Sequence, residues 1–293
     1  MAKKQTLSLV DGRTLDFYVS GPEGAMPLIW HHGTPDSGLQ FDSVRNSVAD
    51  RGLRLITMSR AGYGTSSRSA GRRVVDVAAD TEALLDFLGA TTCLMAGTSG
   101  GGPHALACAS RMDAVLATAI IAGVAPFDAP GLDFLAGMGE ENVVEFGHAV
   151  EGEQVLRTYL EEAREVMMSG GVEGLLQAMN SVLPDVDRAL LSGDLAEEFV
   201  LSTNEALASG VDGWLDDDLA FCQPWGFALG EIKSPVTVWQ GDVDLMVPYA
   251  HGVWQSQTIP NARARLLPGE GHLSIGVGKL EEIIDDLISS AQL

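Results

Sequence analysis

The sequence predicts an α/β fold: a mostly parallel sheet of about eight strands, flanked by helices and interrupted by a helical insertion after the sixth strand. Three observations support this prediction. Short runs rich in branched residues recur between turn signals, segments of helical periodicity alternate with them, and one internal block lacks strand-like runs. Strands that alternate with helices are typical of a parallel sheet with both faces covered.

The expected strands lie at 14–20, 27–31, 53–58, 92–96, 115–121, 235–240 and 263–267. Inner strands of a covered sheet should be continuously apolar, and the runs at 119–121 and 236–239 fit this expectation. The segments 74–88, 103–111 and 277–288 carry apolar residues at helical spacing. We expect them to be the helices that cover the sheet.

Residues 126–231 differ from the rest of the chain in pattern and in charge. Their pattern is helical with acidic outer faces, at 153–168, 174–183 and 195–207. They carry three basic residues against twenty-two acidic ones, a net charge of -19, whereas the whole chain carries -22. The sequence therefore predicts a core domain of residues 1–125 and 232–293, and an acidic helical domain at 126–231.

Composition excludes several classes of partner. A chain of 293 residues with 46% apolar residues can bury a sizeable core, and a charge of -22 would repel nucleic acids and anionic lipid surfaces. No apolar run is long enough to span a bilayer, and the N-terminal segment reaches Asp11 before a signal-peptide core can form. The three cysteines have no disulfide or metal-ligand pattern. We expect a cytoplasmic protein without metal, cofactor or membrane partner.

The segment Gly97-Thr98-Ser99-Gly100-Gly101 is the first candidate for chemistry. It matches Gly-x-Ser-x-Gly, in which small neighbours allow a sharp strand-to-helix turn that exposes the serine hydroxyl. The match alone is weak, but a strand-like run at 92–96 precedes it and a helix-forming segment at 103–111 follows it. This context predicts that Ser99 is a nucleophile.

A serine nucleophile needs a base to take its proton and a carboxylate to orient that base. Among six histidines, His272 lies in a Gly-rich loop directly after the last expected strand, where it can reach over the carboxyl edge of the sheet. Two acids follow the strand at 235–240, and the spacing Gly-x-x-Asp-x-x-x-Pro selects Asp244, which leaves Asp242 as a loop-capping residue. The predicted triad is Ser99, Asp244 and His272.

Attack on a carbonyl creates an oxyanion that needs backbone N–H donors. Gly100, the residue after the nucleophile, is expected to supply one donor. The loop after the strand at 27–31 is expected to supply the other from Thr34, because Gly33 permits a tight turn and Pro35 has no N–H. An ordinary strand-to-helix loop is the alternative for this segment on its own.

Together these segments resemble the α/β-hydrolase superfamily, with the triad in the family's chain order. The matching segments are 32–35, 59–66, 97–101, 241–248 and 271–272, so the resemblance covers nearly the whole chain. The segment 59–66 departs from the family's Asp-x-Arg-Gly-x-Gly-x-Ser at Ser59 and by the added Ala61, beside the site but outside the triad. The resemblance implies that 126–231 is a cap over the active site.

The same resemblance suggests where a substrate would lie. Gly33 and Trp225 are candidate substrate-binding residues, with Phe227 beside Trp225, although aromatic residues where a cap rejoins the core more often serve packing. An apolar, adaptable pocket is indicated by several cap residues, which otherwise pack between helices: Met138, Met167, Met168, Met179 and Trp214.

The predicted function is hydrolysis of a carboxylic ester of a small or medium, neutral small-molecule substrate through an acyl-enzyme on Ser99. A serine at this position counts against the dehalogenases and epoxide hydrolases of the superfamily, which use aspartate. A proline-iminopeptidase-like aminopeptidase remains an alternative, as do a carbon–carbon bond hydrolase or perhydrolase and, from another class, a catalytically weak ligand receptor. The acidic cap is expected to disfavour anionic substrates.

Overall fold

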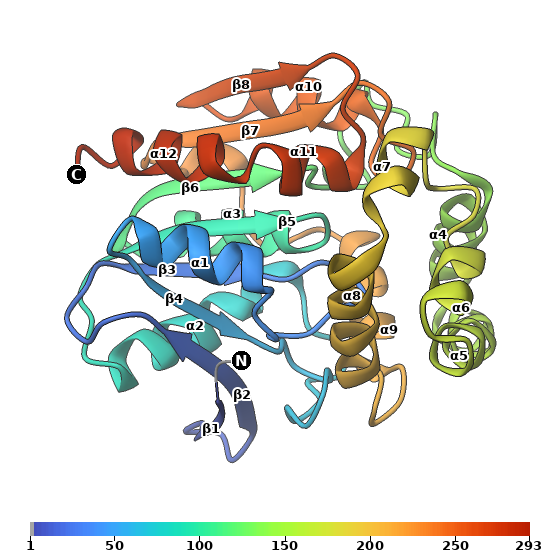
Figure 1. Ribbon diagram of the computed structural model, residues 1–293, viewed down its shortest axis with the longest axis horizontal. Coiled ribbons are helices and arrows are strands. Elements are labelled where there is room, and N and C mark those ends of the chain that lie inside the picture. Colours follow the sequence, from blue (N-terminus) through green and yellow to red (C-terminus); the bar gives the residue numbers. More distant parts are fainter. Residues whose placement is uncertain (1–2) are drawn as a thin grey trace.

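The computed structural model describes residues 3–293 and has one sheet of eight strands at its centre (Figure 1). The strands are β1 (Lys4–Ser8), β2 (Thr14–Ser20), β3 (Pro27–His31), β4 (Arg54–Met58), β5 (Cys93–Thr98), β6 (Val115–Ile121), β7 (Val236–Gly241) and β8 (Ala262–Leu267). Their order in the sheet is β1-β2-β4-β3-β5-β6-β7-β8. Strand β2 is antiparallel to both of its neighbours, and all other pairs are parallel. The mostly parallel α/β sheet is therefore confirmed.

Helices cover both faces of this sheet. The α-helices are α1 (Asp42–Asp50), α2 (Val77–Phe87), α3 (Gly101–Arg111), α4 (Glu140–Glu151), α5 (Glu153–Ser169), α6 (Gly171–Ala178), α7 (Asp185–Leu190), α8 (Gly193–Ala206), α9 (Asp212–Phe221), α10 (Tyr249–Thr258), α11 (His272–Gly278) and α12 (Leu280–Ser290). Short 3₁₀ helices lie at η1 (Val74–Asp76) and η2 (Leu229–Glu231). Helices α2, α3 and α10 share one buried apolar cluster with the sheet, and α1 and α12 share another on the opposite face.

The expected strands agree with the observed ones to within two residues at each end. Strand β1 has no counterpart among the predicted runs, because only Leu7 in it is buried and the strand lies at the edge of the sheet. The segment 74–88 contains η1 and α2 rather than one helix, and 277–288 falls mostly in α12. These differences lie at the ends of elements and leave the predicted architecture unchanged.

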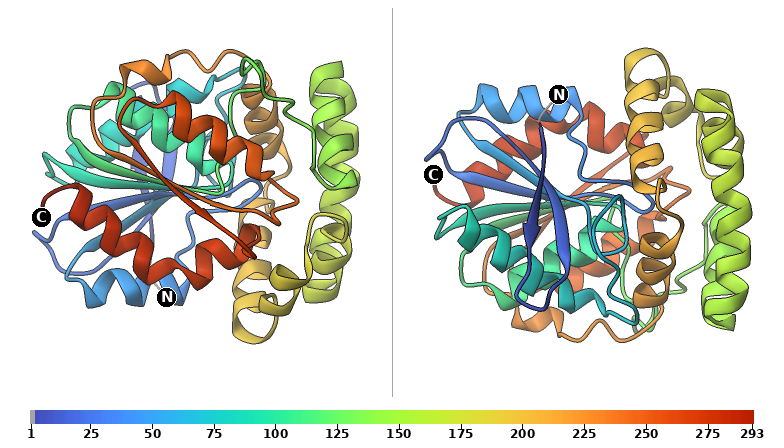
Figure 2. Two further views of the ribbon diagram at one scale, coloured as in Figure 1. Left: turned by 90° about the horizontal axis from the view of Figure 1, so that it is seen from above. Right: turned by 90° about the horizontal axis from the view of Figure 1, so that it is seen from below.

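Six helices, α4–α9, lie between β6 and β7, where the helical insertion is expected. We call residues 140–221 the helical insertion. Figures 1 and 2 show it as a separate layer beyond the carboxyl ends of the parallel strands. Its own apolar cluster also includes Tyr63 and Leu273 of the sheet layer. The flanking Phe134 and Trp225 belong to the main core cluster, so the chain on both sides of the insertion is packed against the sheet layer.

A buried ion pair joins the helical insertion to the sheet layer. Asp217 of α9 is fully buried, and its carboxylate lies 2.6 Å from Arg60 Nη2 and 2.7 Å from Arg72 Nη1. Burial alone would raise the pKa of Asp217, but the two guanidinium groups outweigh that effect and hold the pKa well below its ordinary value. Asp217 therefore remains ionised, and its contribution to stability is lost only in strong acid, as the pH falls through this lowered pKa.

No helix within residues 3–293 combines the length and the apolar character that crossing a bilayer requires.

The ion pair of Asp217 leads to a first prediction. Asp217→Asn should destabilise the protein by about 3–5 kcal/mol, because two buried guanidinium groups would lose their counter-charge. Asp212→Asn on the same helix is the matched control. Its side chain is 41% exposed and lies 2.9 Å from Arg157, so the expected cost is below about 1 kcal/mol. Urea unfolding measures both values, and equal losses would contradict the prediction.

Candidate active site

Ser99 lies at the turn between β5 and α3. Its φ of +54° is in the left-handed region, which non-glycine residues seldom adopt outside constrained turns. The turn is crowded: a Cβ on Gly97 would lie 2.6 Å from the carbonyl carbon of Gly101, and a Cβ on Gly101 would lie 2.6 Å from the carbonyl oxygen of His32. Glycines at these two positions let the chain reverse sharply and hold Ser99 at the carboxyl edge of the sheet.

His272 and Asp244 come together at the same edge. His272 Nδ1 lies 2.8 Å from Asp244 Oδ2, and both side chains are almost completely buried. Asp244 also accepts hydrogen bonds from Gln240 Nε2 at 2.9 Å and from two backbone N–H groups, those of Met246 at 2.8 Å and Val247 at 2.9 Å. A carboxylate held by this many donors has a fixed orientation, and it fixes the imidazole in turn.

Asp242 takes a different role from Asp244. Its side chain is exposed, and Oδ1 accepts a hydrogen bond of 2.7 Å from the N–H of Gly269. It therefore caps the neighbouring loop, while Asp244 faces the histidine.

The environment of His272 favours its protonated form. Burial alone would lower the pKa of this imidazole, but the charge and hydrogen bond of Asp244, with a smaller contribution from Asp187, outweigh burial and raise the pKa. A base with a raised pKa accepts a proton from a serine hydroxyl more readily.

Three of the other buried histidines have different partners. His32 borders the cavity, but its Nδ1 donates to the carbonyl of Gly33 at 2.7 Å and its Nε2 accepts from the N–H of Arg60 at 3.1 Å. His251 bonds the carbonyl of Phe134 at 2.9 Å, and His104 bonds Asp217 at 3.1 Å. The imidazole nitrogens of these residues are thus committed to holding the fold.

Gly33, Thr34 and Gly100 lie around Ser99. A Cβ on Gly33 would be 3.6 Å from the Cβ of Ser99, and a Cβ on Gly100 would be 2.9 Å from the Cβ of Thr34. Gly100 directly precedes α3, so the bonds within that helix leave its N–H free. The positive end of the helix dipole is at the same place, which favours a developing negative charge.

Arg60 and Asp217 hold the loop that carries Thr34. Arg60 donates to the carbonyl of His32, and to the carbonyl of Gly33 at 2.9 Å. Thr34 Oγ1 donates to Asp217 Oδ2 at 2.7 Å. The carbonyl oxygens of this loop are therefore directed toward Arg60, and the threonine side chain is tied to α9.

A cavity of about 280 Å³ connects these groups. Ser99, His272, Gly100, Thr34 and Gly33 all line it, and the helical insertion supplies much of the opposite wall. Among the pocket residues expected from the segment 126–231, Met167, Met179 and Trp214 line the cavity; Met138 and Met168 are not part of its lining.

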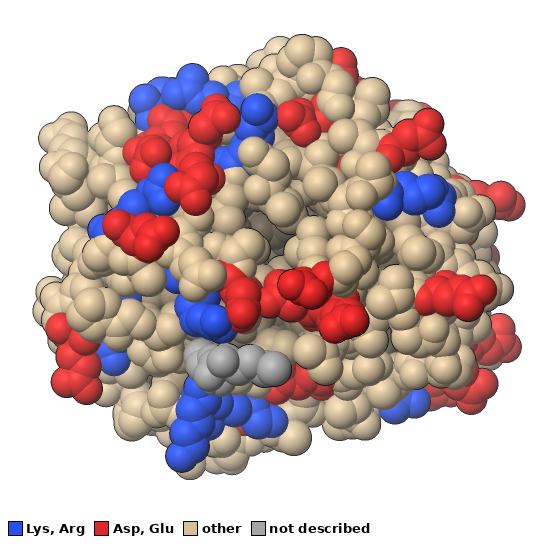
Figure 3. All heavy atoms as spheres, viewed as in Figure 1, with Lys and Arg blue, Asp and Glu red and all other residues tan. Residues whose placement is uncertain are grey.

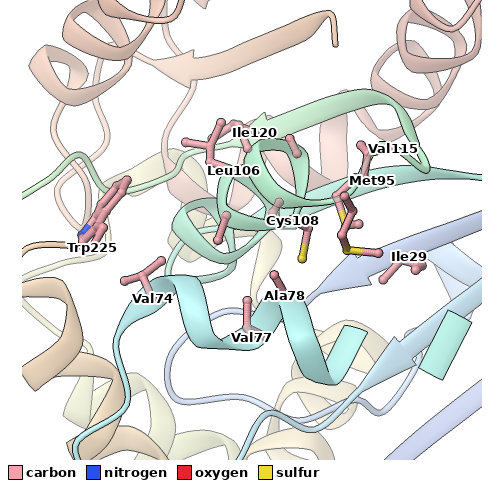
Figure 4. Close-up of a cluster of buried hydrophobic side chains, with 14 of the residues drawn as sticks. Ile29, Val74, Val77, Ala78, Met95, Leu106, Cys108, Val115, Ile120 and Trp225 are labelled. Carbon is pink, nitrogen blue, oxygen red and sulfur yellow. The ribbon is translucent and has the colours of Figure 1, made fainter. Parts of the chain in front are cut away.

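The structure places Trp225 in the core and not at the cavity, where the sequence predicts a substrate-binding role for it. Its side chain is 4% exposed and packs in the main core cluster near Val74, not on the cavity wall (Figure 4). The carbonyl of Trp225 accepts a hydrogen bond of 3.0 Å from the N–H of Val75, which holds this segment beside η1. Phe227 stacks near Trp225, with ring centroids 5.9 Å apart, so both aromatic residues serve packing.

Sequence reasoning missed two carboxylates that support the site. Asp187 of α7 is fully buried and accepts hydrogen bonds from the N–H groups of His272 at 2.7 Å and Ser274 at 2.8 Å, while Asp217 holds the loop of Thr34. One signal was available for Asp217: it is the middle residue of three consecutive acids in a helix, which cannot all face solvent. Asp187 has no comparable signal.

Comparison with known proteins shows which family the chain belongs to. Residues 26–279 match the alpha/beta hydrolase fold family. The chain belongs to this family. Among its alpha/beta hydrolase relatives, a non-heme haloperoxidase from Rhodococcus erythropolis is 25% identical over 84% of this chain and 85% of its own length. A bifunctional esterase/perhydrolase from Acinetobacter calcoaceticus is 23% identical over 95% of this chain and 96% of its own.

The alpha/beta hydrolase fold also recurs among solved structures. A bromoperoxidase from Bacillus anthracis superimposes with a TM-score of 0.73 and 19% identity, covering 98% of this chain and 100% of its own. Family membership and fold together indicate a hydrolytic enzyme.

The raised pKa of His272 leads to a second prediction. Labelling of Ser99 by a fluorophosphonate should slow as the pH falls through an apparent pKa above 6.5, because protonated His272 cannot accept the serine proton. Asp244→Asn should lower the imidazole pKa measured by NMR, whereas the control Asp242→Asn should leave it unchanged. A midpoint of the labelling rate at or below pH 6.5 in the unmodified protein would contradict the raised pKa of His272.

Proposed function

We propose that this alpha/beta hydrolase cleaves carboxylic esters through a Ser99-His272-Asp244 triad. The observation that carries the proposal is the 2.8 Å contact between His272 and Asp244 at a cavity that Ser99 also lines. A buried imidazole oriented by a carboxylate, at the same cavity as a half-buried serine, is the arrangement that nucleophilic acyl transfer needs.

In the proposed reaction, Ser99 Oγ attacks the ester carbonyl while His272 Nε2 takes its proton. The tetrahedral oxyanion accepts hydrogen bonds from the N–H groups of Thr34 and Gly100. Collapse of this intermediate expels the alcohol, which receives the proton from His272, and leaves an acyl-enzyme. His272 then deprotonates a water molecule that attacks the acyl group, releases the acid and restores the serine hydroxyl.

The cavity supports a small or medium substrate. Its volume of about 280 Å³ is at the lower end of ligand pockets, and apolar side chains such as Met179, Phe146 and Phe221 form part of its wall. In this proposal the helical insertion is a cap that encloses the acyl or alcohol group, and its negative charge disfavours anionic esters.

Perhydrolysis is a second candidate for the same site. The relative named as a bifunctional esterase/perhydrolase covers 95% of this chain. Attack of hydrogen peroxide, in place of water, on the same acyl-enzyme would release a peracid with no other change in the residues used. The two activities would therefore share every variant phenotype of the triad.

The nucleophile leads to a third prediction. Ser99→Ala should lower kcat for p-nitrophenyl butyrate about 10⁵-fold to 10⁶-fold, because no other group can form the acyl-enzyme. Ser110→Ala is the control, since that hydroxyl on α3 bonds the local carbonyl of Ala107. Both variants should have the melting temperature of the unmodified protein.

Faster cleavage of proline p-nitroanilide than of the ester would favour an aminopeptidase, and tight binding without turnover would favour a receptor.

The proposed oxyanion donors lead to a fourth prediction. Gly100→Ala should lower kcat about 10²-fold to 10³-fold, because its Cβ would lie 2.9 Å from the Cβ of Thr34 and 3.1 Å from Phe221 and would force the two donors apart. Gly147→Ala in α4 is the control, since its Cβ would meet nothing within 4 Å. Equal activity of the two variants would remove these donors from the mechanism.

A further inference from the structure

Two carboxyl groups of the helical insertion border the cavity and have no part in the proposed triad. Glu145 comes from α4 and Asp218 from α9, and both line the cavity. Asp218 is 1% exposed, and Glu145 is partly buried. The indole N–H of Trp214 donates to Glu145 Oε1 at 2.8 Å. The pair is thus part of the cavity wall and not of the outer surface.

The carboxyl groups of Glu145 and Asp218 interact directly with each other. Burial raises the pKa of each group, a hydrogen bond links the two side chains, and the charge of Glu145 raises the pKa of Asp218 further. A hydrogen bond between two carboxyl groups requires that one of them keeps its proton, so the pair carries a single negative charge when the other group is ionised.

One oxygen atom of the pair still lacks a hydrogen-bond donor from outside the pair. Asp218 Oδ2 is buried and accepts no hydrogen bond from an N–H or hydroxyl group within residues 3–293. Apolar side chains form part of the same cavity wall, among them Phe146, Met167 and Met179. An acceptor in such surroundings favours any ligand that brings a donor to it.

The charges around the pair decide which donor fits. Arg60 and Arg72 both contact Asp217, the neighbour of Asp218 in the chain, so these three groups carry a net charge of about +1. The single charge of the Glu145–Asp218 pair balances that excess. An ammonium group would add an unbalanced positive charge and a carboxylate an unbalanced negative one, whereas a neutral donor adds neither.

We propose that Glu145 and Asp218 form a subsite for an uncharged hydrogen-bond donor, a hydroxyl or amide N–H group, on the acyl or alcohol chain of the substrate. This inference rests on the proposed ester hydrolysis, since it names the class of ester that the same cavity selects. It predicts preference for hydroxylated esters over purely aliphatic or charged ones of equal length.

Binding to the Ser99→Ala variant tests the subsite without turnover. The probes are methyl esters of straight-chain acids with six to ten carbons, each ending in a methyl, hydroxyl or ammonium group. Isothermal titration calorimetry should show, at one chain length or more, about tenfold tighter binding of the hydroxyl-ended ester than of the other two. Equal affinities at every length, or tightest binding of the ammonium-ended ester, would overturn the proposal.

Second substitutions in the Ser99→Ala background assign the preference to the pair. Asp218→Leu should reduce the ratio of hydroxyl-ended to methyl-ended affinity to about one, because the acceptor is lost. Asp218→Asn should keep the ratio, because its amide N–H₂ can donate to Glu145 and its carbonyl oxygen can still accept. Met179→Leu is a control on the cavity wall that should shift both affinities together and keep the ratio.

Different results would refute the proposed esterase activity and the proposed Glu145–Asp218 subsite. If the unmodified protein hydrolyses none of the methyl or p-nitrophenyl esters, the proposed esterase activity is wrong, yet the affinity ratios still decide the subsite. If esters are hydrolysed and Asp218→Leu keeps the preference for the hydroxyl-ended probe, the activity stands and the subsite is refuted. Thermal melts of each variant confirm that the ratios are measured on folded protein.

Discussion

The buried carboxylate of Asp217 is the contact on which the geometry of the site depends. Removing a charge from water is costly, and the cost is offset only when opposite charges and hydrogen-bond donors surround it. Asp217 meets this condition with partners from four separate segments: Arg60, Tyr63, Arg72, Thr34 and His104. One side chain of the helical insertion thereby fixes the loop of Thr34, the turn after β4 and the start of α3. A change in the position of α9 would move the proposed oxyanion donors with it.

Asp187 does the same for the other half of the site. It binds two N–H groups at the start of α11, where His272 is the first residue. The helical insertion thus supports both loops that bear the proposed machinery. This changes the meaning of the charge of -19 carried by residues 126–231, which contain the helical insertion. Two of its acids, Asp216 and Asp217, are buried and paired with arginines of the sheet layer, and Asp187 and Asp218 are buried as well. Other acidic side chains lie on the outer surface, and Figure 3 shows more acidic than basic side chains over this layer.

Sequence reasoning predicted those features that local pattern encodes. Continuous apolar runs located the inner strands, and the turn at Ser99 was recognisable because the strand, the small residues and the helix adjoin in the chain. The edge strand β1 was missed because exposure removes the apolar run that marks a strand. The anchors Asp187 and Asp217 were missed because their partners are distant: Arg60 and Asp217 are 157 residues apart. Trp225 was misplaced for a related reason, since an aromatic residue at a junction can face either the cavity or the core.

Two neighbouring buried acids of α9 have different roles: Asp217 stabilises the structure, and Asp218 belongs to the proposed substrate subsite. Asp217 meets two guanidinium groups and is ionised, so it can only anchor; its neighbour Asp218 meets another carboxyl, shares a proton and keeps acceptor capacity toward the cavity. Because the helix is rigid, the anchor that positions Thr34 also sets where Asp218 stands relative to Ser99. Substrate choice and oxyanion geometry are therefore mechanically linked through one helix. Altering specificity through cavity-facing side chains such as Met179 leaves this link intact, whereas repacking α9 would disturb both at once.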